Sequence, residues 1–145
     1  MEEDEYRATY HQVNEQRCVF EKTLNAQRGR CSRSKHFLLA GREGYACRSQ
    51  KGHQQCRSLL ETMRSHARFT LGLTKIEGPL PHNKEIRVQV GGLIGLQSPE
   101  KGPLIQDIAE TVDAAIMQYG SIKALPYQEL VKAMLAFEGR KKRRR

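Results

Sequence analysis

Apolar positions along this chain recur mainly with the period of an α-helix. The clearest case is the stretch from residue 53 to residue 71, where they return every three or four residues. This spacing predicts a helix with one buried face that ends near Gly72, because glycine commonly follows the last turn of a helix. The buried face consists of Cys56, Leu59, Leu60, Met63 and Ala67.

Three further segments show the same helical spacing. The first covers residues 6–24 and is expected to stop in the basic loop around Gly29. The second covers residues 103–119, with a proline at its first position and a glycine just after its last turn. The third covers residues 126–137 and leads into a run of basic residues.

One segment, residues 85–96, has the alternation of a β-strand. Three β-branched residues alternate there with polar ones, which is the pattern of a strand buried on one side. The glycines that follow indicate a tight turn or a bulge. The β-branched residues are Ile86, Val88 and Val90, and the glycines are Gly91, Gly92 and Gly95. A shorter apolar run at residues 37–39 is expected to be buried.

Together these patterns predict a mainly α-helical fold, a small helical bundle with one short β element near residues 85–96. The length of 145 residues suits a single domain, which we assign to residues 1–139, with residues 140–145 as a flexible basic tail. Hydrophobic residues make up 38% of the chain and aromatic residues 6%, with no Trp, so the core is expected to be small. A small core gains much from a bound metal or a disulfide.

All four cysteines of the chain lie in its first 56 residues: Cys18, Cys31, Cys47 and Cys56. Thiolates bind soft metals strongly, and four of them complete either an iron–sulfur cluster or a tetrahedral zinc site. The gaps of twelve, fifteen and eight residues contain no close C-x-x-C pair, which favours a cluster over structural zinc. We therefore predict that two neighbouring helices and their loop hold a [4Fe–4S] cluster.

Other interpretations of the cysteines stay open. Zinc is the alternative metal, and His53 would replace one thiol in a Cys₃His site. Cys18 and Cys56 are also compatible with simple core positions, because free cysteine is among the most buried residue types. A disulfide or a reactive thiol is the remaining alternative.

The chain begins with an acidic stretch and has no apolar run long enough for a signal peptide or a membrane span. We therefore expect a cytoplasmic protein without a membrane span. Thiols stay reduced in that compartment, which favours metal binding over disulfides.

The net charge of +9 is concentrated in two places. Residues 17–68, around the cysteines, contain twelve Lys or Arg and three acidic residues. If a cluster is present, four arginines near the cysteines are expected to raise its reduction potential: Arg30, Arg33, Arg48 and Arg57.

The other concentration of positive charge is the C-terminal tail. It is predicted to bind polyanions, nucleic acid included, or alternatively to act only as a solubilising arm. No aromatic residues are interleaved with its charges, which argues against a platform for single-stranded nucleic acid. The tail consists of Arg140, Lys141, Lys142, Arg143, Arg144 and Arg145.

The segment LPHNKEIRVQVGGLIGLQ (residues 80–97), HFLLAGREGYAC (residues 36–47) and the four-cysteine layout resemble a family of small, uncharacterised bacterial proteins. The resemblance covers residues 17–137 and implies no activity, although it supports treating the cysteines as a set. No arrangement of nucleophile, acid and base indicates an enzyme.

These observations predict a small metalloprotein for electron transfer, or an accessory subunit, with a redox partner or a larger complex as its partner. The alternative is a basic protein associated with nucleic acid or ribonucleoprotein, with structural zinc or no metal.

Overall fold

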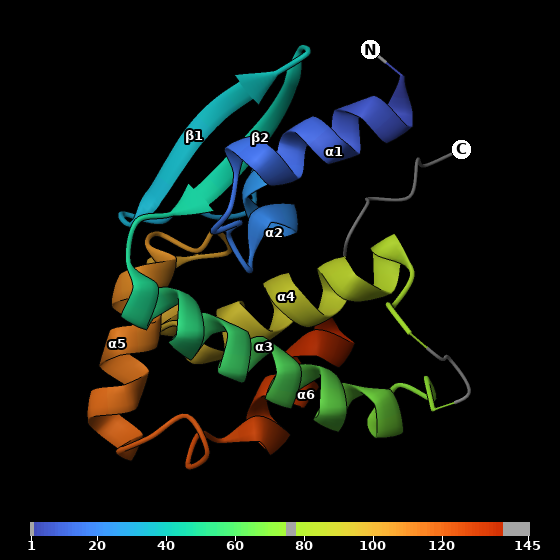
Figure 1. Ribbon diagram of the computed structural model, residues 1–145. Coiled ribbons are helices and arrows are strands. Elements are labelled where there is room, and N and C mark those ends of the chain that lie inside the picture. Colours follow the sequence, from blue (N-terminus) through green and yellow to red (C-terminus); the bar gives the residue numbers. More distant parts are fainter. Residues whose placement is uncertain (1, 75–77, 138–145) are drawn as a thin grey trace, which may run out of the picture.

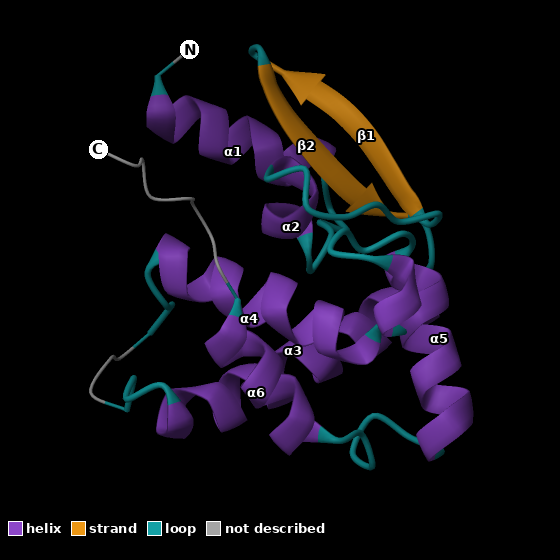
Figure 2. Ribbon diagram, turned by 180° about the vertical axis from the view of Figure 1, so that it is seen from behind, coloured by secondary structure: helices purple, strands orange, loops and turns teal. Residues whose placement is uncertain are grey.

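A computed structural model describes residues 2–74 and 78–137 of the chain. Within these residues it has six α-helices, one short 3₁₀ helix and one antiparallel pair of strands, so the predicted mainly α-helical class is confirmed (Figures 1 and 2). The elements are α1 (Glu3–Val13), α2 (Glu21–Asn25), β1 (Ser34–Leu39), β2 (Arg42–Cys47), α3 (Gln50–Thr70), α4 (His82–Leu96), η1 (Pro99–Lys101), α5 (Ile108–Tyr119) and α6 (Tyr127–Ala136).

The β element lies at residues 34–47 and not at the predicted residues 85–96. β1 and β2 form a hairpin in which Ser34 faces Cys47 and Leu39 faces Arg42. Ala40 and Gly41 make the turn with φ of 51° and 78°, a conformation that glycine adopts without strain. The expected buried run at residues 37–39 is also wrong, because strand alternation turns Leu38 outward with 66% of its surface exposed.

The segment predicted as a strand is the helix α4. Its sequence lacks the usual helical periodicity because this helix contacts protein on several sides and needs no continuous polar face. Val88, Val90 and Leu93 are fully buried, and even Glu85 and Gln89 are inside. A helix buried on several sides lacks the periodicity that distinguishes it from a strand.

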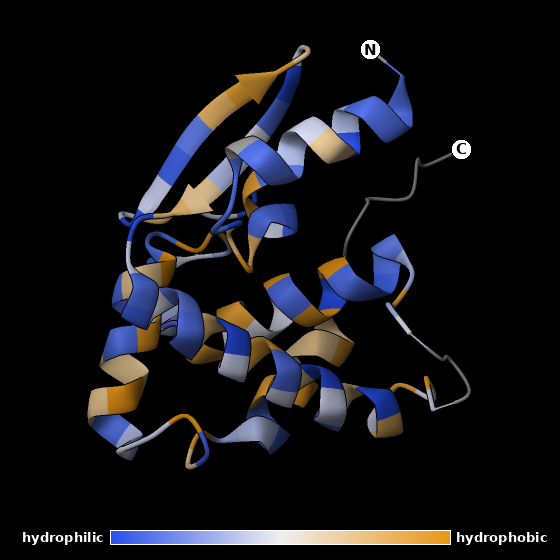
Figure 3. Ribbon diagram, viewed as in Figure 1, coloured by the Kyte–Doolittle hydropathy of each residue, from blue (hydrophilic) through white to orange (hydrophobic). Residues whose placement is uncertain are grey.

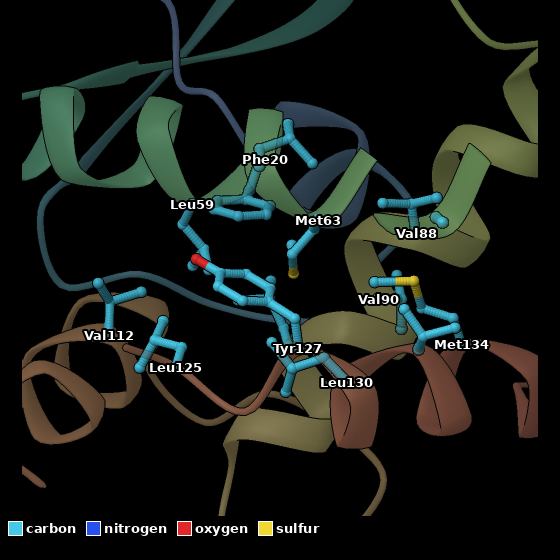
Figure 4. Packing of buried hydrophobic residues seen from close by; sticks show 14 of the residues in the cluster. Phe20, Leu59, Met63, Val88, Val90, Val112, Leu125, Tyr127, Leu130 and Met134 are labelled. Atoms are coloured by element: carbon cyan, nitrogen blue, oxygen red, sulfur yellow. The ribbon is translucent and has the colours of Figure 1, made fainter. Parts of the chain in front are cut away.

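The glycines of α4 are packing positions and not turn residues. A Cβ atom added to Gly91 would lie 2.6 Å from the Cα of Met134 on α6, so the two helices approach closely there. Buried side chains of α3, α4 and α6 meet around this crossing, and Phe20 adds an aromatic ring from the N-terminal segment (Figure 4). The core of the protein is centred on these three helices.

The single predicted helix over residues 6–24 is two helices. α1 ends at Val13, and residues 16–18 run instead beside β2, with Arg17 paired to Ala46. A buried polar group closes this break: Tyr10 donates to Glu21, and the Asn14 amide donates to Tyr10 at 2.8 Å. Pairing with a strand distant in sequence overrides the local helical spacing here.

The other predicted helices differ less from the structure. α3 ends as expected before Gly72, and α6 starts directly after Pro126. α5 begins at Ile108 and not near residue 103, because the Asp107 side chain caps it by accepting from the amide of Ala109 at 3.1 Å. Its end at Gly120, with φ of 94°, agrees with the prediction.

Residues 140–145, the predicted polyanion-binding tail, lie outside the described residues. Among the helices of the described part, none is long and apolar enough to cross a membrane.

Candidate functional site

The four cysteines come from four different parts of the fold. Cys18 lies between α1 and α2, Cys31 precedes β1, Cys47 is the last residue of β2, and Cys56 lies in the second turn of α3. The predicted arrangement of two helices flanking a loop is therefore wrong, since a hairpin and two loops provide three of the positions. The base of the hairpin stands beside the start of α3 and α5 (Figures 1 and 2).

Cys18 and Cys47 are brought together by strand-like pairing. The amide of Cys18 donates to the carbonyl of Tyr45 at 3.0 Å, and the amide of Cys47 donates to the carbonyl of Gln16 at 2.9 Å. The side chain of Gln16 also donates to the carbonyl of Cys47, at 2.7 Å. These bonds hold the segment of Cys18 beside the end of β2 that carries Cys47.

The loop of Cys31 is held against the start of α5. The amide of Arg30 donates to the carbonyl of Ile105 at 3.0 Å, and the amide of Ser32 donates to the Asp107 carboxylate at 2.9 Å. On its other side, the Ser34 hydroxyl donates to the carbonyl of Cys31 at 2.8 Å. The loop is thus bonded both before and after its cysteine.

Cys56 is placed by the sharp entry into α3. Ser49 caps this helix two residues after Cys47, and its hydroxyl accepts from the amide of Gly52 at 2.9 Å. The same short connection leaves the Cys47 thiol to donate to the carbonyl of Ser49 at 3.2 Å. Helix α3 therefore starts at the base of the hairpin, and Cys56 lies in the second turn of this helix.

The four thiols act on one another electrostatically, and this holds for every pair among them. Burial, followed by repulsion from the neighbouring thiolates, raises the pKa of Cys18 and of Cys56 from about 9 to about 12. Burial also raises the pKa of Cys31. Burial and mutual repulsion therefore oppose the loss of all four protons, and a bound cation would offset both.

Backbone amides point at two of the sulfurs. The amide of Phe20 donates to Cys18, and the amides of Arg33 and Ala109 donate to Cys31; each bond lowers the pKa of its thiol. In both loops one donor lies two residues after the cysteine. Such bonds stabilise a thiolate and are among the features that tune iron–sulfur sites.

The arrangement of side chains also bears on whether the protein could bind a single metal ion. Among residues 2–74 and 78–137, no three His, Cys, Asp or Glu side chains are arranged as ligands of one metal ion. His53, the alternative zinc ligand, has its Nε2 atom 3.0 Å from the carbonyl of Arg17. The sulfur ligands of a cluster stand further apart than those of one zinc, because iron and sulfide atoms lie between them.

One basic side chain is fixed next to the thiols. Arg33 is held by Asp113 of α5, with Nη2 2.6 Å from Oδ2 and Nη1 3.3 Å from Oδ1. The hydrogen bond to Asp113 contributes most to the raised pKa of Arg33, and the charges of Cys31 and Cys47 add to it. Arg33 in turn acts to lower the pKa of Cys56. We therefore single out Arg33 from the four arginines that the sequence indicated.

Sequence reasoning missed the groups that support this site. Asp113 lies eighty residues from the arginine it holds, and no local pattern links the two. The donors at Phe20 and Ala109 are backbone amides, which any residue except proline supplies.

The raised thiol pKa values predict how the stability of the metal-free protein depends on pH. Between pH 9 and 12 the folded chain keeps protons on Cys18 and Cys56 that the unfolded chain releases. The free energy of unfolding is therefore expected to fall as pH rises through this window, and the thiol contribution is complete below it. Urea unfolding at several pH values measures this slope. The double variant Cys18→Ala, Cys56→Ala should have a shallower slope, and an unchanged slope would contradict the assignment.

Comparison of the chain with protein-family models, curated proteins and solved structures finds no match.

Proposed function

We propose that the chain is a small iron–sulfur protein that binds one [4Fe–4S] cluster through Cys18, Cys31, Cys47 and Cys56. The observation that carries the proposal is the mutual electrostatic influence of the four thiols, although they come from four separate segments. Soft thiolate ligands suit iron–sulfur clusters and zinc equally well. The spacing without close C-x-x-C pairs favours the cluster.

Electron transfer is the function that such a centre supports best. When bound, the cluster supplies one-electron chemistry; the chain holds it through its thiols, sets its electrostatic surroundings and limits its contact with water. The cysteines are half-buried, and three of them pack against the hydrophobic core, so the fold shields the site without closing it off. A role as an accessory subunit of a redox complex uses the same properties.

Arg33 is expected to set the reduction potential of the cluster. Its positive charge favours the more negative, reduced state, so Arg33→Gln should lower the midpoint potential by tens of millivolts. Protein-film voltammetry or a redox titration followed by absorbance measures the shift.

Arg48→Gln is the matched control, because Arg48 directly follows a cysteine but is exposed. It should change the midpoint much less than Arg33→Gln does. Equal shifts in both variants would mean that overall charge, and not the arginine held by Asp113, tunes the centre.

Anaerobic purification followed by spectroscopy tests the proposed function. The protein should be brown, with broad visible absorbance that fades when dithionite is added and an electron paramagnetic resonance signal that arises at the same time. A colourless protein with no signal after anaerobic reconstitution with iron and sulfide would refute it.

The alternative function, nucleic-acid binding with structural zinc or no metal, has less support. Its principal candidate surface, the basic tail, lies outside the described residues. A mobility-shift assay with and without residues 140–145 would assess the tail directly, since binding through it should be strongly salt-dependent.

A further inference from the structure

A groove of about 670 Å³ runs along α3 on the side where Cys18 lies. One wall is α3 itself, and the other is formed by the segment around Cys18 and by residues 78–80 with the start of α4. Much of α3 is hydrophilic (Figure 3). We call this feature the α3 groove.

Basic side chains line both walls of the α3 groove. Arg57, Arg64 and Arg68 follow one another along α3, and Arg17 and Lys22 stand on the other wall. From residue 53 to residue 68 the helix covers about 22 Å at 1.5 Å per residue. The positive groups therefore form a row and do not converge on one point.

Most of the acidic charge in the α3 groove is already neutralised. Glu21 accepts from Arg17 at 2.6 Å, and buried Glu85 accepts from Arg64 at 2.6 Å. Glu61 is the third acidic residue of the lining. Lys22 and Arg57 form no ion pair within the described part of the chain, so their charges are available to a ligand.

The shape and chemistry of the α3 groove fit an acidic stretch of polypeptide. A row of separate charges matches carboxylates spaced along an extended chain, and partly exposed Val19 adds an apolar contact. None of the described lining residues is Phe, Tyr or Trp, so the lining lacks the aromatic side chains on which the bases of single-stranded nucleic acid stack. We propose that the α3 groove docks an acidic segment of a partner protein.

Docking there would bring the partner to the cysteine group, since Cys18 is part of the lining. That the partner exchanges electrons rests on the proposed function, whereas the binding itself does not. Complementary charge mainly speeds association and orients the partner, as a transient redox contact requires.

Fluorescence anisotropy tests the docking with a fluorescein-labelled poly-glutamate peptide of about eight residues, matched to the length of the groove. Residues 140–145 are all replaced by Gln in every protein, so the tail does not compete for the peptide. The double variant Lys22→Glu, Arg57→Glu should bind the peptide at least about tenfold more weakly. The control variant Lys35→Glu, Lys123→Glu changes the net charge equally at exposed sites outside the groove lining and should bind nearly as well as the parent.

A second readout ties the binding to the groove: bound peptide should slow alkylation of Cys18 more than that of Cys31, which is not in the lining. Equal weakening in both double variants, or absence of peptide binding, would overturn the proposal. Tighter binding of a poly-uridine oligonucleotide, lost in the same groove variant, would also overturn it in favour of nucleic acid. The peptide-binding assay needs no metal, so absence of peptide binding would not contradict the cluster proposal. Absence of a cluster would likewise not contradict docking of the peptide.

Discussion

Replacing Cys56 with Ala is expected to abolish cluster binding while the fold survives. Cys56 lies on α3, is half-buried, and would become a residue with high helix propensity. Loss of one of four thiolate ligands should reduce iron bound per chain by at least about tenfold, more than the loss of a supporting contact does. Iron analysis after anaerobic reconstitution measures this, and circular dichroism checks that helical content is unchanged.

Ser58→Ala is the matched control for this substitution, because Ser58 lies two residues further along the same helix and is exposed. It should bind as much iron as the unchanged protein. If Cys56→Ala keeps its iron, Cys56 is a core residue and not a ligand, and the four cysteines do not act as a set.

Replacing Gly91 with Ala is expected to destabilise the protein strongly. The added Cβ would meet the Cα of Met134 at 2.6 Å, and because that neighbour is backbone, no side-chain movement relieves the clash. Separating α4 from α6 would loosen the centre of the core. We expect the free energy of unfolding to fall by about 3 kcal/mol, near the upper end for overpacked cores. Urea unfolding followed by circular dichroism measures the change.

Gly95→Ala is the comparison on the same helix. Its added Cβ would lie 3.0 Å from the Cβ of Ala133 and 3.3 Å from the Cα of Leu130, so the overlap with α6 is smaller than at Gly91. The gain in helix propensity, about 1 kcal/mol, should offset most of the crowding. Equal destabilisation by both substitutions would show that the contact with the α6 backbone is not the cause.

How well each element could be predicted depended on its surroundings. α3 has solvent on one side and core on the other, so its spacing predicted it nearly to the residue. α4 is buried on several sides and lost that periodicity, and its glycines suggested turns because close packing of helices leaves no local sign. The break after α1 depends on pairing with β2, about thirty residues away.

The candidate site was likewise only partly predictable from the sequence. The sequence suggested that the four cysteines form a set, because cysteine is rare and carries distinctive chemistry. It could not indicate which elements hold them, since the pairing of Arg17 with Ala46 and of Gly29 with Ile105 is long-range. Nor could it select Arg33 from its neighbours, because Asp113, on a distant helix, fixes that side chain.

The central claim is that four thiols hold one [4Fe–4S] cluster, and counting iron and acid-labile sulfide per chain tests it most directly. The protein should be purified without oxygen and compared with a variant in which all four cysteines are replaced by Ala. We predict about four iron and four sulfide per chain in the unchanged protein and neither in the variant. One zinc per chain without sulfide, or four free thiols with no metal after reconstitution, would contradict the account.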